Sequence, residues 1–289
     1  MNRLEQFANR CLRMQPKLGI IAGGGNLPQR IIEVCRASGR AYYVIGIKGH
    51  ASPDDLKGSP HSWISIARAE SGFRILKNEK INEVVMIGDV KVPSLIKNWP
   101  DFRTFKFFLI IFIKSFFNFV GDNSILVALA RELEKEGINV IGVQDILENL
   151  LAPEGLLGNV HIPEESLSDI KFGISTAIKL GNRDLGQAVI VKSGAVVIEE
   201  GKDGTAQMIK ESRKKTPNGH GGLLIKLKKS GQDRRLDMPT IGVNTVVEAS
   251  KAGLSGIIIQ AGETLIIDIE SVISVANKKG IFIKSINLN

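Results

Sequence analysis

Short apolar runs alternate with amphipathic stretches through the first half of the chain. The runs are rich in Ile and Val and predict buried strands at 17–22, 42–47, 84–87 and 139–143. Apolar positions at helical spacing predict intervening helices at 29–39, 65–76 and 124–136. Strands and helices that alternate in this way are typical of a parallel sheet covered by helices. The sequence therefore predicts an α/β fold that begins with a Rossmann-like N-terminal domain.

Residues 151–163 interrupt this pattern with two Pro and two Gly, and we expect a short linker there. The predicted domains are 1–158 and 159–289. In the second domain, helices are expected at 169–180, 204–214, 245–252 and 269–279. Strands are expected at 188–192, 195–199, 223–227, 256–260, 264–267 and 281–286. Because the first two of these strands form a hairpin, we predict a second α/β domain with a mixed sheet.

The composition excludes several classes of protein. The chain has 289 residues, of which 43% are hydrophobic and 24% charged, so it is not disordered. Two cysteines, Cys11 and Cys35, and four scattered His exclude a disulfide scaffold and a Cys/His metal cage. The first fifteen residues carry arginines but no apolar stretch, which predicts no secretory signal. A reducing, cytoplasmic setting is expected.

The formal net charge is +8, which favours a polyanionic partner: nucleic acid, an anionic membrane surface or a phosphorylated substrate. There is no RNP motif or zinc finger, and Trp and Tyr number only two each, so we expect no nucleic-acid partner. A basic surface that is merely solvated stays open as an alternative.

A Phe-rich segment at 102–120 holds eight of the twelve Phe of the protein. Arg and Lys interrupt the segment, so none of its uncharged stretches is long enough to span a bilayer. Three interpretations stay open. The segment is a buried helix, an interfacial segment on anionic lipid, or the lining of a groove for an acyl chain.

The first candidate site follows the first predicted strand and consists of Gly23, Gly24, Gly25 and Asn26. A glycine loop before a helix exposes backbone N–H groups to a phosphate. The dinucleotide fingerprint would need a glycine where Pro28 stands, and Lys48 rather than an acid follows the second strand. We therefore expect a phosphate-binding loop and disfavour a nicotinamide-dependent oxidoreductase. A simple tight turn remains the alternative.

The second candidate site is a cationic strip within 226–242. Its cations are Lys226, Lys228, Lys229, Arg234 and Arg235. Such cations can neutralise a diphosphate, and a carboxylate among them, Asp233 or Asp237, can hold Mg²⁺ or orient a water. A surface loop with local ion pairs would have the same composition. The stiff, apolar segment after Asp237, Met238-Pro239, favours a carboxylate held in place.

Further acidic side chains lie near predicted turns, at Asp89, Asp122, Asp184, Glu199 and Asp203. Asp122 is the strongest metal candidate among them, because its position suits both helix capping and cation binding. The sequence contains no nucleophile elbow, Walker A loop or H-E-x-x-H motif.

Five motifs together resemble a known family. They lie at 20–28 (I-I-A-G-G-G-N-L-P), 121–122 (G-D), 150–158 (L-L-A-P-E-G-L-L-G), 184–187 (D-L-G-Q) and 231–242 (G-Q-D-R-R-L-D-M-P-T-I-G). In this order they resemble the UDP-2,3-diacylglucosamine pyrophosphatases of the LpxI type. The resemblance covers the chain from about residue 17 to residue 286.

The resemblance implies a Mg²⁺-dependent hydrolase of lipid A biosynthesis, cytoplasmic and peripheral on the inner membrane. Such an enzyme splits UDP-2,3-diacylglucosamine with water into UMP and 2,3-diacylglucosamine 1-phosphate (lipid X). Its partners would be the acylated nucleotide sugar and the membrane surface, and the oligomeric state stays open, with a homodimer included. A non-catalytic binding protein for an anionic lipid or nucleotide is the main alternative.

Carried over by position, Asp237 corresponds to the family's catalytic aspartate, and Asp233 is its predicted catalytic neighbour. Asp237 and Asp122 are the predicted metal ligands. The predicted substrate-binding residues are Gly23, Gly24, Gly25, Asn26, Gln187, Lys226, Arg234, Arg235 and Thr240. Two positions depart from the family's usual sequence: Ala206 stands in place of an acid, and Val243 in place of a proline.

Overall fold

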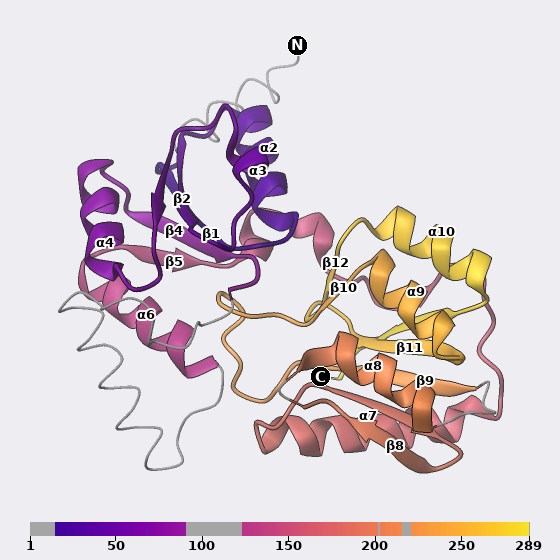
Figure 1. Cartoon of the computed structure of the whole chain (residues 1–289). Coiled ribbons are helices and arrows are strands. Elements are labelled where there is room, and N and C mark those ends of the chain that lie inside the picture. Colours follow the sequence, from indigo (N-terminus) through magenta and orange to yellow (C-terminus); the bar gives the residue numbers. More distant parts are fainter. Residues whose placement is uncertain (1–14, 91–122, 202, 216–220, 289) are drawn as a thin grey trace. The chain divides into compact units, whose positions relative to one another are not determined.

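The computed structural model describes residues 15–90, 123–201, 203–215 and 221–288, and the chain forms two compact units (Figure 1). Unit 1 comprises 1–148 and unit 2 comprises 149–289. The division lies earlier than the boundary at 158 predicted from the sequence. The reason is that a short strand, β6 (Gly155–Leu157), pairs with the last strand of unit 2 instead of forming a linker.

Unit 1 contains a five-stranded sheet in the order β3-β2-β1-β4-β5. Its strands are β1 (Leu18–Ala22), β2 (Tyr42–Ile47), β3 (His61–Ile64), β4 (Glu83–Ile87) and β5 (Asn139–Ile141). All four pairings are parallel. The predicted Rossmann-like parallel sheet is therefore confirmed. The edge strand β3 was not predicted.

The helices of unit 1 that the structure describes are α2 (Leu27–Ser38), α3 (Pro53–Leu56), α4 (Ala69–Asn78) and α6 (Asn123–Lys135). A short 3₁₀ turn follows at Val143–Asp145, and a second one, Glu148–Leu150, spans the point in the chain where unit 1 ends and unit 2 begins. Figure 1 shows α2 and α3 on one face of the sheet and α4 and α6 on the other. Leu18, Ile20 and Val44 are fully buried between these layers.

Unit 2 contains a mixed sheet, as predicted, and its strands lie in the order β6-β13-β11-β9-β7-β8. The further strands are β7 (Ala188–Lys192), β8 (Ala195–Glu199), β9 (Gly222–Lys226), β11 (Leu254–Gln260) and β13 (Phe282–Ile286). β9, β11 and β13 are parallel, whereas β7 runs antiparallel to β9 and β8, and β6 antiparallel to β13. A separate parallel pair joins β10 (Thr240–Ile241) to β12 (Leu265–Ile266).

Helices cover both faces of this sheet. They are α7 (Ser166–Asn182), α8 (Gly204–Lys215), α9 (Val243–Lys251) and α10 (Ile269–Lys279). α7 covers one face and the other three cover the opposite face (Figure 1). Side chains alternate accordingly: Leu224 packs toward α8–α10, and its neighbours Leu223 and Ile225 pack toward α7.

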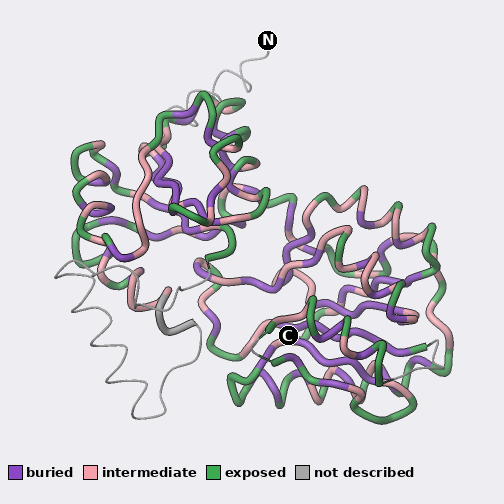
Figure 2. The backbone as a smooth tube through the Cα atoms, in the orientation of Figure 1, coloured by how far each residue is buried: buried purple, intermediate pink, exposed green. Residues whose placement is uncertain are grey.

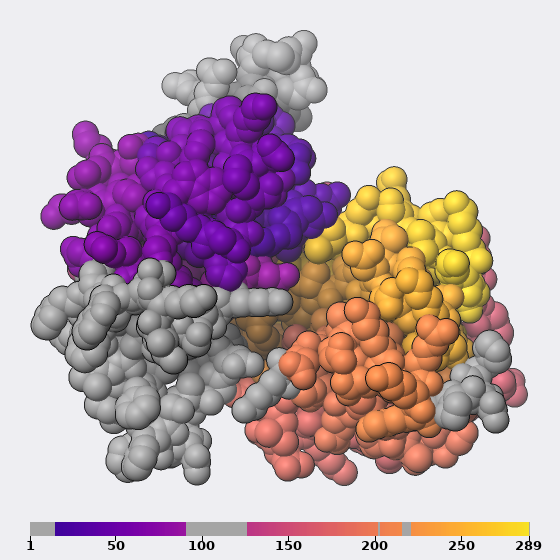
Figure 3. Space-filling model, in the orientation of Figure 1, coloured from indigo at the N-terminus to yellow at the C-terminus, as the bar shows by residue number. Residues whose placement is uncertain are grey.

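The burial pattern follows the layers. The central strands of unit 2, β7, β9, β11 and β13, form a continuous buried interior, and the outer faces of the helices are exposed (Figure 2). In the space-filling view, α8, α9 and α10 form the near surface of unit 2, in orange to yellow (Figure 3). The interior of unit 2 is therefore two apolar layers, one on each face of a single sheet.

Two predictions fall on residues that the structure does not describe. The Phe-rich segment 102–120 and Asp122 lie outside the described residues. Among the helices that are described, none has the length and apolar character needed to cross a bilayer.

Candidate active site

The candidate site of unit 2 lies where its parallel strands end. Lys226 is the last residue of β9, and Gln187 directly precedes β7, whose first residue is in register with Lys226. The carbonyl oxygen of Gln187 accepts a hydrogen bond from the Leu227 N–H at 2.9 Å. The fold thus brings together two residues that are far apart in sequence. Ligands of open α/β sheets bind outside this edge of the sheet.

The segment 227–239 connects β9 to β10 and is fixed by hydrogen bonds and by two buried side chains. The Lys228 N–H donates to Gln260 Oε1 at 3.2 Å. Leu236 and Met238 are buried and anchor the loop on the domain. At its far end, Lys226 Nζ donates to the Thr240 carbonyl oxygen at 3.0 Å, which joins two more of the predicted residues. The loop is therefore anchored on the domain and is not a free surface segment.

Asp237 is held by a buried amide. Gln232 is 6% exposed, and its Nε2 donates to Asp237 Oδ2 at 2.6 Å. The Oε1 of the same amide accepts from the Lys229 N–H at 3.1 Å, which fixes the orientation of the amide. Asp237 Oδ1 accepts no hydrogen bond from any described residue. One carboxylate oxygen therefore stays available for a water, a metal ion or a substrate.

Asp233 forms an ion pair with Arg235. Its carboxylate accepts from Arg235 Nε at 3.0 Å, from the guanidinium Nη2 at 2.7 Å and from the Arg235 backbone N–H at 3.0 Å. These hydrogen bonds hold the pKa of Asp233 below its ordinary value. A carboxylate that stays ionised and fully engaged is a poor proton donor or acceptor. The geometry favours a positioning role for Asp233, which orients Arg235, over the catalytic role predicted from the sequence.

Most other cations of the strip have acidic partners. Arg234 Nε and Lys228 Nζ lie 3.2 Å and 3.0 Å from Glu263 Oε2. Lys229 Nζ lies 3.1 Å from Asp184 Oδ1. The alternative of local ion pairs therefore holds for these cations. Their field on a ligand is weaker than the sequence count suggests, because Glu263 and Asp184 offset part of it.

A second acidic group lies at the same edge of the sheet. Glu200 is 8% exposed and accepts from the Gln187 N–H at 2.8 Å and from the Thr205 hydroxyl. The Gln187 Oε1 atom is buried and lacks a hydrogen-bond partner among the described residues, so it can accept from a ligand. Ala206, where the resemblance led us to expect an acid, is exposed on α8.

Sequence reasoning missed Gln232, Glu200 and Glu263. Gln232 lies inside the motif at 231–242, but its position five residues before Asp237 does not indicate a contact between the two side chains. Glu263 follows β11 and reaches the strip only through the fold. Glu200 lies between Glu199 and Asp203, which the sequence analysis did consider. The nearby Thr205, whose hydroxyl donates to Glu200, was the available signal of a site residue there.

The glycine loop of unit 1 follows β1, as predicted, but two of its glycines serve packing. The Gly23 N–H donates to the Ile87 carbonyl and the Gly24 N–H to the Asp89 carbonyl, each at 2.8 Å. A Cβ on Gly23 would lie 2.7 Å from the Asp89 oxygen, so only glycine fits. These two N–H groups are therefore not exposed to a ligand, contrary to expectation.

The other two residues of the loop are more open. Gly25 has φ +88°, a backbone conformation that favours glycine, and there is open space where a Cβ would lie. Asn26 precedes the first residue of α2, and its side chain makes no capping hydrogen bond. Only this half of the loop keeps the geometry of a phosphate-binding turn.

Comparison with known proteins identifies the family. Sequence profiles of the LpxI N-terminal domain and the LpxI C-terminal domain match residues 17–150 and 153–284. The chain belongs to the LpxI family. A protein of Caulobacter vibrioides named UDP-2,3-diacylglucosamine pyrophosphatase LpxI is 33% identical over 279 residues, which are 94% of this chain and 98% of that protein.

Solved structures give weaker matches to this LpxI family member. A GalE-like L-threonine dehydrogenase from Cupriavidus necator is 8% identical with a TM-score of 0.32, covering 94% of this chain and 86% of its own. The UDP-glucose 4-epimerase of Thermus thermophilus is 12% identical with a TM-score of 0.31, covering 93% and 85%. Scores this low carry no argument about function.

The described part of this LpxI family member contains no group of three or more His, Cys, Asp or Glu side chains that could hold a metal ion. Mg²⁺, however, is often bound by one or two carboxylates together with substrate phosphates. The open Oδ1 of Asp237 fits such a shared site as one ligand. Asp122, the other predicted ligand, lies outside the described residues.

Proposed function

We propose that this protein hydrolyses UDP-2,3-diacylglucosamine into UMP and 2,3-diacylglucosamine 1-phosphate, lipid X, a step of lipid A biosynthesis. The observation that carries the proposal is the carboxylate of Asp237, fixed by Gln232 and open at Oδ1, on the loop that follows β9 in unit 2. The printed name of the Caulobacter relative, identical at 33% of aligned positions, supports the same reaction.

In this reaction the P–O–P bridge of the diphosphate breaks. The hydroxyl of one water bonds to one phosphorus, and the proton goes to the bridging oxygen, which stays on the other phosphorus. Asp237 is the residue proposed to orient the water or hold Mg²⁺ through Oδ1. Arg235, oriented by Asp233, is proposed to offset the charge of the diphosphate. Mg²⁺ would add charge neutralisation and a more acidic bound water.

Substrate binding is proposed to use the remaining predicted residues of unit 2. Gln187 offers a buried acceptor atom, and Lys226 and Arg234 add positive charge at the same edge of the sheet. Thr240 lies at the start of β10, with its carbonyl on Lys226. In unit 1, the proposed contacts are reduced to Gly25 and Asn26.

We also propose that the protein works in the cytoplasm at the surface of the inner membrane. The substrate's acyl chains lie in lipid, and each methylene that leaves water is worth about 0.8 kcal/mol. A net charge of +8 favours an anionic leaflet.

The proposal is tested by incubating the purified full-length protein with UDP-2,3-diacylglucosamine in Mg²⁺ or in EDTA. Mass spectrometry should find UMP and the acylated sugar phosphate in Mg²⁺ and much less of both in EDTA. Protein that binds the substrate and releases no product in either buffer would instead be a non-catalytic binding protein. Equal turnover in both buffers would contradict only the metal requirement.

A further inference from the structure

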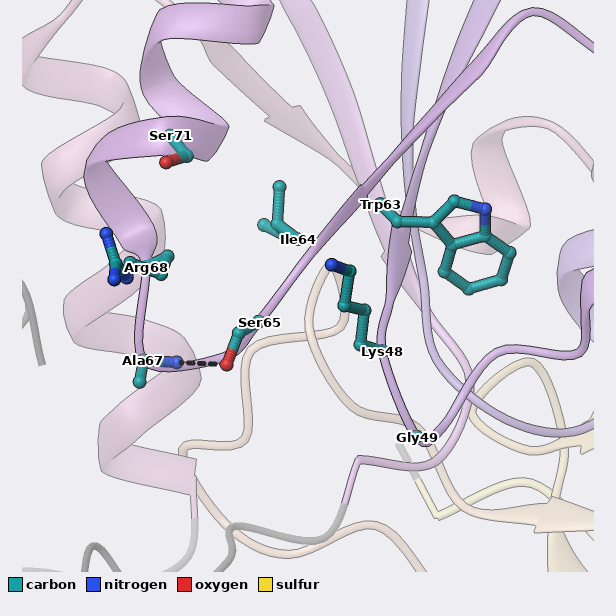
Figure 4. A pocket seen from close by; sticks show the side chains of 8 residues that line it. All are labelled: Lys48, Gly49, Trp63, Ile64, Ser65, Ala67, Arg68 and Ser71. Atoms are coloured by element: carbon teal, nitrogen blue, oxygen red, sulfur yellow. Dashed lines mark hydrogen bonds between the residues drawn. The ribbon is translucent and has the colours of Figure 1, made fainter. Parts of the chain in front are cut away.

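Unit 1 contains a pocket that none of the preceding sites uses. It has a volume of about 730 Å³ and opens where β2 and β3 end and α4 begins (Figure 4). Its lining includes the side chains of Lys48, Trp63, Ser65, Arg68 and Ser71. Pockets of roughly 300–1,000 Å³ are the usual size for small organic ligands. The pocket can therefore hold a group as large as a nucleotide.

The charge of the pocket is positive. Lys48 and Arg68 are exposed, and neither forms an ion pair with a described residue. In Figure 4 they lie on either side of Ser65, and Ser71 adds a second hydroxyl near Arg68. No carboxylate is among the described residues that line the pocket. This contrasts with the strip of unit 2, where Lys228, Lys229, Arg234 and Arg235 all have acidic partners.

The walls of the pocket are held by the backbone. The Lys48 N–H donates to the Ile64 carbonyl at 2.8 Å, which ties the end of β2 to the end of β3. The Ala67 N–H donates to Ser65 Oγ at 3.4 Å and the Arg68 N–H to the Ser65 carbonyl at 2.9 Å, forming a turn. Lys48 and Arg68 thus lie on two segments of unit 1 that backbone hydrogen bonds join to the end of β3.

The position of Lys48 in the fold indicates which ligand group it meets. In dinucleotide-binding sheets of this strand order, an acidic residue after the second strand binds the ribose hydroxyls, and a cation nearby accommodates a phosphate. Lys48 directly follows β2 here, and Arg68 directly precedes α4. Two cations, with no carboxylate among the described residues that line the pocket, favour a phosphate oxyanion over a neutral sugar.

We infer that the Lys48–Arg68 pocket binds a phosphorylated half of the nucleotide sugar. This inference rests on the proposed function for the identity of the ligand. The phosphate belongs either to uridine 5′-phosphate or to the glucosamine 1-phosphate half, and both present the same oxyanion to Lys48 and Arg68.

The test is calorimetric titration of the full-length protein with UMP, uridine, glucosamine 1-phosphate and glucosamine. The double variant K48A/R68A is compared with R74A/K77A, which removes the same charge from exposed positions of α4 outside the pocket. At least one phosphorylated probe should bind more tightly than its phosphate-free counterpart. K48A/R68A should weaken that binding by about tenfold or more, and R74A/K77A by less than about twofold.

The inference is overturned if K48A/R68A binds the phosphorylated probe as the wild type does. Equal losses in both double variants, or no preference of the wild type for a phosphorylated probe, would overturn it as well. The probe that responds identifies the half of the substrate concerned. Failure of the proposed function is seen separately: the wild type would bind the probe through Lys48 and Arg68 and yet hydrolyse no UDP-2,3-diacylglucosamine.

Discussion

Among the described residues, one side chain, that of Gln232, donates a hydrogen bond to the carboxylate of Asp237 and orients it. Gln232 donates to one oxygen and is itself fixed by the Lys229 N–H, so the second oxygen points away from the amide. Catalytic rates respond strongly to such placement, because a misplacement of about 1 Å can cost about a hundredfold in rate. Gln232 is therefore expected to act as a positioning residue in turnover.

Replacing Gln232 by Ala should lower kcat by about ten- to hundredfold, because the Asp237 carboxylate loses its fixed partner. KM should change much less, since Gln232 is buried and reaches substrate only through Asp237. Steady-state kinetics on UDP-2,3-diacylglucosamine measures both. The control is Gln207→Ala, which removes an exposed amide bonded to Glu211 on α8. Equal kcat values in the two variants would refute the positioning role.

The Asp233–Arg235 pair predicts a pH dependence of stability. Because Arg235 holds the folded-state pKa of Asp233 below the ordinary 3.8, the ionised carboxylate stabilises the fold above that value. This contribution is lost as pH falls from 3.8 through the lowered pKa. Asp233→Asn should thus reduce the free energy of unfolding at pH 7 and have no effect in stronger acid.

Urea denaturation of both proteins over this pH range measures the difference. The exposed Asp54 of α3 forms no ion pair among the described residues, so Asp54→Asn is the matched control. The pair is partly exposed, so the effect at pH 7 should be small. A difference between wild type and Asp233→Asn that persists unchanged into acid would contradict the assignment.

For single residues, the sequence predicts where the candidate site lies better than it predicts which side chains contact one another there. The motif at 231–242 indicates Asp237, Asp233 and the two arginines because they are neighbours in the chain. The partners that neutralise the cations come from elsewhere: Glu263 from the turn after β11 and Asp184 from the end of α7. Contacts between distant segments depend on the packing of the sheet, which residue spacing does not encode.

Among the elements, the loop after β1 is the one whose role the structure changes most. Its first glycine lies against the backbone that follows β4, where a Cβ would approach two carbonyl oxygens at 2.7 and 2.8 Å. Gly23 thus allows the ends of β1 and β4 to come together at the centre of the sheet. The sequence around Gly23 predicts a phosphate-binding loop, whereas its contacts show that Gly23 is needed for close packing of the backbone.

Gly23→Ala should therefore destabilise the protein by about 1–3 kcal/mol, since the backbone must shift to admit the methyl group. Denaturant titration followed by circular dichroism measures this loss. Gly201→Ala is the control, because nothing lies within 4 Å of its Cβ position and its φ is not in the left-handed region. Stability equal to that of the control variant would show that the loop does not pack as described.

The elements themselves were largely predictable. The strands β2, β7 and β8 and the helix α10 occupy the ranges expected from the pattern of apolar residues. The missed strands are β3, β6 and β10, which have two to four residues each. Strands this short contain too few residues for an alternation of apolar and polar positions to be recognised in the sequence. They form where a partner strand from elsewhere in the chain is available for pairing.

For the molecule as a whole, the net charge of +8 and the acylated substrate that we propose predict attachment to anionic membranes. The protein should sediment with vesicles that contain phosphatidylglycerol and much less with pure phosphatidylcholine. Binding should fall when salt rises from about 0.05 M to about 0.5 M, because the Debye length shortens. Equal sedimentation with both vesicles, unaffected by salt, would contradict an electrostatic attachment.

The central claim is that Asp237 serves the chemical step of a pyrophosphate hydrolase. The direct measurement compares turnover and binding of UDP-2,3-diacylglucosamine by the wild type and by Asp237→Asn, which keeps the size of the side chain and the contact with Gln232. The account predicts a loss of kcat of about a hundredfold or more with a dissociation constant within about threefold of wild type. Full turnover by Asp237→Asn would contradict it.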